Sequence, residues 1–124
     1  MNFLKTILYY ICNQTNINMK YKVFQIPFPE TDAEEKIFCN YAYKHLDWID
    51  KVHPEYYKET YEGNLETSST DVMDILEELF TLLNINHPED YTGHSLSVSD
   101  VIEINDHHYY CDAYGWKEVD FNVL

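Results

Sequence analysis

The stretch DVMDILEELFTLL, residues 71–83, decides the fold. On a helical wheel its apolar side chains fall within one arc, and its acidic side chains fall on the opposite side. The arc holds Val72, Ile75, Leu76, Leu79, Phe80 and Leu83, and the opposite side carries Asp71, Asp74, Glu77, Glu78 and Thr81. Hydroxyl side chains at residues 67–70 are suitable N-caps, and the early acids favour the positive end of the helix dipole. The stretch therefore predicts a helix over residues 71–83 with one packing face and one acidic face.

The residues after this helix predict a C-terminal hairpin. Residues 84–88 end the helix, and residues 89–93 form a loop. Residues 101–104 form a compact β-rich run, a polar turn follows at 105–107, and residues 108–112 return as a second strand. Residues 116–123, after Gly115, supply a last strand.

The residues before the helix predict further short strands. Residues 21–28 alternate in polarity until Pro27 and Pro29 end the run. Residues 37–43 also favour a strand, whose candidate core side chains are Phe38, Tyr41 and Tyr43. A short helix is expected over residues 45–51. A strand over residues 56–61 is expected to run into a turn at residues 62–64.

These elements add up to one α+β domain. We expect a small antiparallel sheet, which can be curled, with the helix of residues 71–83 against it. A chain of 124 residues with 45% hydrophobic side chains is too apolar for a disordered acidic tail. Residues 1–19 are expected to be an N-terminal extension of a domain that spans residues 20–124. The apolar run in this extension is too short to cross a membrane and lacks the features of a signal peptide.

Two motifs resemble a known family. Residues 83–102, LNINHPEDYTGHSLSVSDVI, and residues 109–119, YYCDAYGWKEV, resemble the YodL-like domain. Residues 21–25 and 61–65 look like that family's opening strand and mid-domain turn, so the resemblance covers residues 20–121. It implies a cytoplasmic accessory protein of Gram-positive bacteria or of their conjugative elements and phages, and it supplies no catalytic residue.

The same motifs have a structural interpretation. The apolar side chains among them are candidate core residues, and the two glycines are candidate turn residues. The former are Leu96, Val98, Val101, Ile102 and Ile104, and the latter are Gly93 and Gly115.

The charge of the chain is concentrated in one window. The chain has 22 acidic residues, eight lysines and no arginine, which gives a net charge of -14. Between Glu59 and Trp116 there are thirteen acidic residues and no basic one, so this window alone carries -13. Such an imbalance either serves solubility or attracts positively charged partners. Direct binding of nucleic acid is not expected from so acidic a chain.

Enzymatic and metal sites are not expected. Residues 93–97 approach the Gly-x-Ser-x-Gly motif of serine hydrolases, but Ser97 replaces the second glycine and a loop precedes Ser95 where the motif needs a strand. His107, His108, Cys111 and Asp112 are ligand types without the spacing of a zinc site. The three cysteines have no paired spacing, which is typical of reduced thiols in a cytoplasm. We therefore expect a non-enzymatic protein without a metal or another cofactor.

Two functions remain as hypotheses. Four acids over residues 71–78 give about one charge per 3.5 Å of helix, which is close to the spacing of about 3.4 Å along one DNA strand. The first hypothesis is an anti-defence protein, an anti-CRISPR or antirestriction nucleic-acid mimic that blocks the basic channel of a CRISPR effector nuclease or a restriction enzyme. The alternative is an interaction module that binds a host structural or regulatory protein through the hairpin, with the charge serving solubility. The candidate partner-binding residues are Asp71, Asp74, Glu77, Glu78, Glu89, Asp90, Tyr91, Tyr109 and Tyr110.

Overall fold

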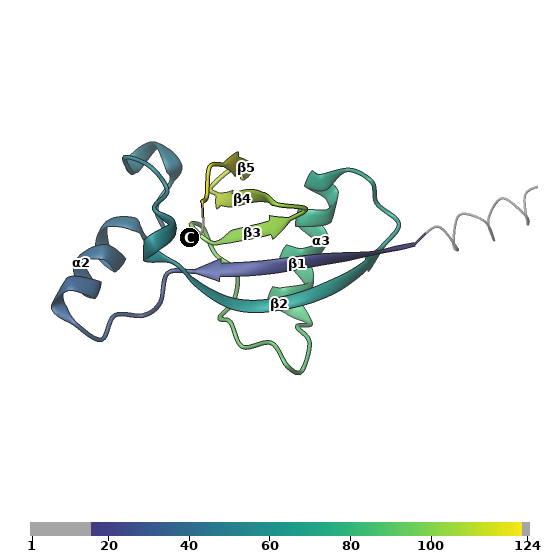
Figure 1. The fold of residues 1–124 in the computed structure, drawn as a ribbon, viewed down its shortest axis with the longest axis horizontal. Coiled ribbons are helices and arrows are strands. Elements are labelled where there is room, and N and C mark those ends of the chain that lie inside the picture. The colour runs from purple at the N-terminus through teal and green to yellow at the C-terminus, as the bar shows by residue number, and fades with distance from the viewer. Residues whose placement is uncertain (1–15, 123–124) are drawn as a thin grey trace, which may run out of the picture.

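The computed structural model describes residues 16–122, which form one open antiparallel sheet with helices at its side and end (Figure 1). The sheet has the strand order β2-β1-β3-β4-β5. In chain order the elements are β1 (Ile17–Gln25), α2 (Asp32–Tyr41), η1 (Leu46–Trp48), η2 (Pro54–Tyr56), β2 (Lys58–Thr67), α3 (Val72–Ile85), β3 (Val101–Ile104), β4 (His107–Asp112) and β5 (Gly115–Val119). The predicted α+β class, with a main helix and a C-terminal hairpin, is confirmed.

Strand β1 organises the sheet because it pairs on both sides. It pairs with β2 from Ile17 to Gln25 but with β3 only over Tyr21 to Phe24. The first residues of β1 and the last residues of β2 therefore extend beyond the other strands as a two-stranded ribbon, which Figure 1 shows. Ile17 to Met19, which we expected to belong to an N-terminal extension, are part of this strand.

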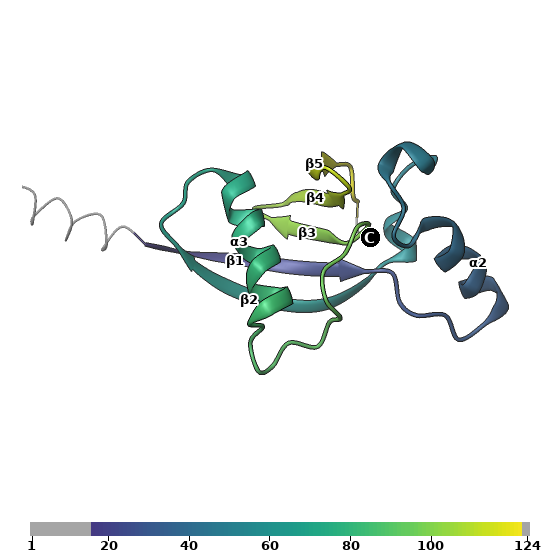
Figure 2. The same cartoon turned by 180° about the vertical axis from the view of Figure 1, so that it is seen from behind.

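Helix α3 covers one face of the sheet (Figure 2). Its buried side chains, Ile75, Leu76, Leu79 and Leu83, pack with Tyr21, Val23 and Ile102 of the sheet in the larger of two core clusters. This is the predicted apolar arc, since Val72 and Phe80 also pack against the cluster. The N-cap is Asp71, whose side chain accepts a hydrogen bond from the backbone N–H of Met73 over 2.8 Å, and not one of the hydroxyls before it.

Within residues 16–122, the opposite face of the sheet is covered at one end only. Phe24, Val101, Tyr110 and Phe121 form the second core cluster there, and side chains from residues 46–57 pack against them. Towards the ribbon this face is polar, because successive side chains of a strand alternate between faces. Lys20 and Lys22 of β1 are therefore on the face away from α3.

Residues 37–43, predicted as a strand, instead form the end of helix α2 and the turn after it. The Thr31 hydroxyl accepts a hydrogen bond from the backbone N–H of Glu34 and caps the helix, whose first turn carries three acids. The Thr-x-x-Glu pattern of residues 31–34 matches a capping-box sequence, although Glu34 Oε1 accepts the backbone N–H of Glu30 over 3.2 Å and not that of Thr31. This capping signal outweighs the β-propensity of the aromatic residues. Helix α2 has no buried residue and lies beyond the end of the sheet, so Tyr43 is exposed and not in a core.

The turn predicted at residues 62–64 is also wrong, because β2 runs straight through it. Gly63 faces the core opposite Tyr21, and an added Cβ atom would lie 2.7 Å from the Tyr21 hydroxyl and 2.6 Å from the Tyr61 ring. The glycine is needed for this close approach and not for a turn. Gly115, in contrast, has a φ of +117° at the turn into β5, as a turn glycine requires.

Other predictions differ from the structure mainly in their boundaries. The helix expected over residues 45–51 is a single 3-10 turn, Leu46–Trp48, and the last strand ends at Val119. The hairpin turn consists of Asn105 and Asp106, both with positive φ, which matches the right-handed twist of the strands. Among the expected core side chains near the hairpin, Val98 is only partly buried.

A buried polar cluster attaches the segment before β3 to the sheet. Gln25 is fully buried, and its amide nitrogen donates to Asp100 Oδ2 over 3.0 Å and to the carbonyl of His94. The same carboxylate oxygen accepts the backbone N–H of Ser97 over 2.8 Å. Burial raises the pKa of Asp100 to about 6, although these hydrogen bonds and His94 act to lower it.

Candidate binding face on helix α3

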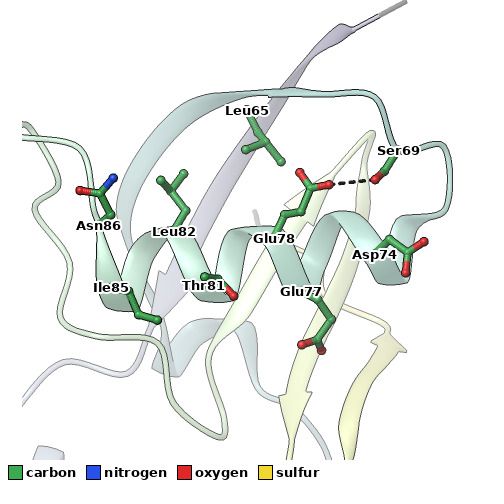
Figure 3. Close-up of a pocket in the computed structure, with 9 residues that line it drawn as sticks. All are labelled: Leu65, Ser69, Asp74, Glu77, Glu78, Thr81, Leu82, Ile85 and Asn86. Atoms are coloured by element: carbon green, nitrogen blue, oxygen red, sulfur yellow. Dashed lines mark hydrogen bonds between the residues drawn. The ribbon is translucent and has the colours of Figure 1, made fainter. Parts of the chain in front are cut away.

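An open hollow of about 710 Å³ lies between helix α3 and the end of strand β2 (Figure 3). Strand β2 leads into the segment of residues 68–71, which turns back into the helix, so the two elements enclose the hollow on two sides. Its lining residues are Leu65, Ser69, Asp74, Glu77, Glu78, Thr81, Leu82, Ile85 and Asn86. Seven of these nine come from the helix and the residue that follows it.

The hollow has an apolar part and an acidic part. Leu65 and Leu82 point towards each other between β2 and the helix, while Ile85 extends from the other side of the helix end and has 79% of its surface exposed. Asp74, Glu77 and Glu78 lie towards the start of the helix, and all three are exposed. We call the surface formed by these nine lining residues the α3 face.

The four acids of the helix differ in how firmly they are held. Glu78 Oε1 accepts hydrogen bonds from the hydroxyls of Ser69 and Thr67, at 2.8 and 3.1 Å. Asp71 is the N-cap. Within residues 16–122, Asp74 and Glu77 have neither a side-chain hydrogen bond nor a lysine within 4 Å, so their charges are available to a partner.

The rest of the acidic window is partly balanced by strand β1. Lys20 lies 3.5 Å from Glu62, and Lys22 lies 3.7 Å from Glu59 and 3.9 Å from Glu103. These pairs are on the sheet face away from α3. Folding therefore brings two lysines of β1 to three acids of the lysine-free window, and it leaves the α3 face without such compensation in the described part of the chain.

The loop after α3 adds two further acids near the end of the helix. Glu89 and Asp90 are exposed, and the Tyr61 hydroxyl donates to Asp90 Oδ1 over 2.9 Å. Tyr91 is partly buried and donates its own hydroxyl to the carbonyl of His94. Burial and the charge of Asp100 raise the pKa of Tyr91 to about 12, so its ring and hydroxyl belong to the fold.

Tyr109 and Tyr110, predicted as anchors of an interface, lie inside the protein. Tyr110 is fully buried and donates to the carbonyl of Lys44 over 2.6 Å, while Tyr109 packs in the cluster under α3. Burial raises the pKa of both hydroxyls. Because the two adjacent side chains point to opposite core clusters, the hairpin has neither tyrosine free for a partner.

Sequence reasoning missed the apolar residues of the α3 face. Leu82 and Ile85 follow the acids on the helix, and Leu65 comes from a strand that was predicted to end before it. Leu82 and Ile85 are three residues apart, which places them on one side of a helix. This spacing was a usable signal for the helical part, whereas the position of Leu65 depends on the pairing of β2 with β1.

No metal site is formed by the residues that the structure describes. His107 lies 3.0 Å from Glu118 and His108 lies 2.8 Å from Glu103, so each histidine has a carboxylate partner of its own.

Among residues 16–122, no helix has the length and apolar character needed to cross a membrane.

Comparison with known proteins identifies the family of the chain. No curated protein and no solved structure matches it. The family description of the YodL-like domain matches residues 20–121, a range that includes every strand and helix of the structure apart from the first three residues of β1. The chain therefore belongs to the YodL-like domain family.

Proposed function

We propose that this protein is a non-enzymatic anti-defence protein that acts in the cytoplasm as an acidic nucleic-acid mimic. Its α3 face would occupy the basic channel of a host nuclease, such as a CRISPR effector or a restriction enzyme. The observation that carries the proposal is the pair Asp74 and Glu77, which are exposed and free of lysine partners within the described residues. Basic pockets that bind phosphate oxygens also accept carboxylates, since both are anions with several acceptor oxygens.

The electrostatic contrast between the two faces of the sheet favours binding over mere solubility. Acids that serve only solubility can be scattered over the whole surface, without a region of one sign. Here three acids on the sheet face away from α3, Glu59, Glu62 and Glu103, pair with lysines, and the acids of α3 within the described residues do not. A basic partner would therefore be oriented towards α3 before contact.

Displacement by nucleic acid tests this proposal. The full chain is immobilised and incubated with a bacterial lysate at low salt, and the bound proteins are then eluted with duplex DNA or with RNA. The proposal expects basic nucleic-acid-binding proteins to elute, and it expects the chain to inhibit cleavage by any nuclease among them. Retention of the bound proteins in an excess of both nucleic acids would contradict mimicry.

A second candidate function is a module that binds a host structural or regulatory protein, and the apolar residues of the α3 face favour it. Leu65, Leu82 and Ile85 form an apolar surface that a channel built for phosphates has no reason to match. Partners that remain bound in excess nucleic acid would support this alternative. With Tyr109 and Tyr110 buried, the α3 face replaces the hairpin as its binding surface.

A further inference from the structure

The length of the hollow and its exposed apolar residues indicate what kind of partner the α3 face binds. The hollow extends along the helix from Asp74 to Asn86, which corresponds to about 18 Å at 1.5 Å per residue. This is the length of about three turns of a second helix. Ile85, at one end of the hollow, is 79% exposed, so its apolar surface is accessible to an occupant.

The charges along the hollow restrict its occupant. Its acids, Asp74, Glu77 and Glu78, are all in the first half of the helix, whereas Leu82 and Ile85 are in the second half. Within the described residues, no lysine lines the hollow. An occupant that covers the whole hollow must bury apolar side chains at one end and bring positive charge to the other.

A second copy of this chain does not meet that requirement. The two copies would each carry a net charge of -14, and like charges brought together on facing surfaces repel. A nucleic acid is excluded by the same argument, because its phosphates are negative. The occupant that remains after these two exclusions is a basic segment of another protein.

We propose that the α3 face binds a basic amphipathic helix of about three turns from a partner protein. Leucine-type side chains of that helix pack on Leu65, Leu82 and Ile85, and its lysines or arginines pair with Asp74 and Glu77. This is the helix-in-groove mode, in which apolar side chains anchor the segment and flanking charges select it. The inference rests on the proposed function in one respect, because both assign the acids of the α3 face to a basic partner protein, and it adds an apolar contact that a channel for phosphates alone does not supply.

Binding of designed peptides to the full chain tests the inference. The probe is a synthetic amphipathic helix of leucine and lysine, about four turns long, with the leucines on one side. Two matched peptides replace either all leucines by serine or all lysines by glutamine. We expect the probe to bind and each matched peptide to lose affinity by about tenfold or more, since each loses one of the two required contacts.

Variants of the chain locate the binding site. Ile85→Ser removes an exposed apolar side chain, and the double variant Asp74→Asn/Glu77→Gln removes two exposed charges that have no side-chain hydrogen bond or lysine partner within the described residues. Each is expected to weaken probe binding by about tenfold, the equivalent of about 1.4 kcal/mol. The matched control is Asp32→Asn/Glu35→Gln, which removes two exposed charges from α2 and should leave binding unchanged. Thermal unfolding of each variant confirms that it is folded.

Three results would overturn the inference. The first is equal binding of the probe and the serine peptide. This result would show that binding depends on charge alone, which is still consistent with nucleic-acid mimicry. The second is an unchanged affinity in both the Ile85 and the Asp74/Glu77 variants. The third is binding only after deletion of residues 1–15, which would assign the hollow to the chain's own N-terminal segment. Displacement of natural partners by nucleic acid tests the proposed function separately, so the two proposals can fail independently.

Discussion

At the scale of single residues, Asp100 gives the most specific expectation about stability. Its carboxylate is 2% exposed, and burial raises its pKa from 3.8 to about 6. The unfolded chain keeps the ordinary value, so the folded state binds the proton more tightly. The resulting contribution to stability is fully present below about pH 3.8 and is lost as the pH rises through about 6.

Substitution of Asp100 by asparagine should remove this pH dependence. An asparagine side-chain oxygen can still accept from Gln25 and Ser97, so the local fold can persist. Between pH 4 and pH 7 the wild-type chain should lose stability relative to Asp100→Asn by an amount on the order of 2 kcal/mol. Urea unfolding of both proteins across this range measures it. Parallel stability curves would contradict the assignment, because the two proteins differ only at this residue.

Gly63 gives a second expectation at the same scale. A methyl group there would lie within 3 Å of the Tyr21 and Tyr61 rings, both of which are held by packing. Gly63→Ala should therefore destabilise the protein by about 1–3 kcal/mol, as overpacking of a core does. Asn64→Ala, at the neighbouring exposed position of β2, is the matched control and should change stability by less than about 0.5 kcal/mol. Chemical unfolding that gave equal effects for both variants would contradict the close approach.

At the scale of elements, the start of α3 tests the capping assignment. The Asp71 side chain accepts the backbone N–H of Met73, whereas Thr70 is exposed and does not cap the helix. Asp71→Ala should cost about 1 kcal/mol in unfolding free energy. Thr70→Ala should cost much less. The reverse order would mean that a hydroxyl caps the helix, as the sequence first indicated.

Local sequence signals predicted the elements whose stability is local. Helix α3 and the β3–β4 hairpin were predicted because periodicity, turn residues and packing all favour one structure. Helix α2 was not predicted, because the aromatic residues of residues 37–43 favour a strand by propensity. The capping signal at residues 31–34 is what determines the helix in the structure. Strand β2 was cut short because glycine was taken as a turn signal, although its role depends on the Tyr21 ring of the neighbouring strand.

The candidate site was predictable in its charge but not in its shape. The acids of α3 follow from the helical wheel, and the structure leaves Asp74 and Glu77 exposed as expected. The apolar part of the hollow could not be predicted, because it includes Leu65. The position of Leu65 depends on the pairing of β2 with β1, which are far apart in the sequence. Tyr109 and Tyr110 could not be distinguished from interface residues, because alternation within a strand does not show that both faces of a sheet are covered.

At the scale of the whole molecule, the charge itself should be measurable in stability. A net charge of -14 destabilises the compact state through self-repulsion, and salt screens that repulsion. The melting temperature of the wild-type chain should therefore rise with sodium chloride. The rise should be smaller in Asp74→Asn/Glu77→Gln than in Asp32→Asn/Glu35→Gln, because α3 contains no lysine, whereas α2 carries Lys36 one turn after Asp32. Identical salt responses would show that the two acidic regions are equivalent.

The central claim is that the α3 face is the surface by which this protein binds a basic partner. The most direct test measures how much protein the immobilised chain captures from a bacterial lysate, at low and high salt, for the wild type and the two charge variants. The account predicts capture by the wild type and by Asp32→Asn/Glu35→Gln at low salt, a steep loss at high salt, and little capture by Asp74→Asn/Glu77→Gln at either. Equal capture by all three proteins, or capture that salt does not weaken, would contradict it.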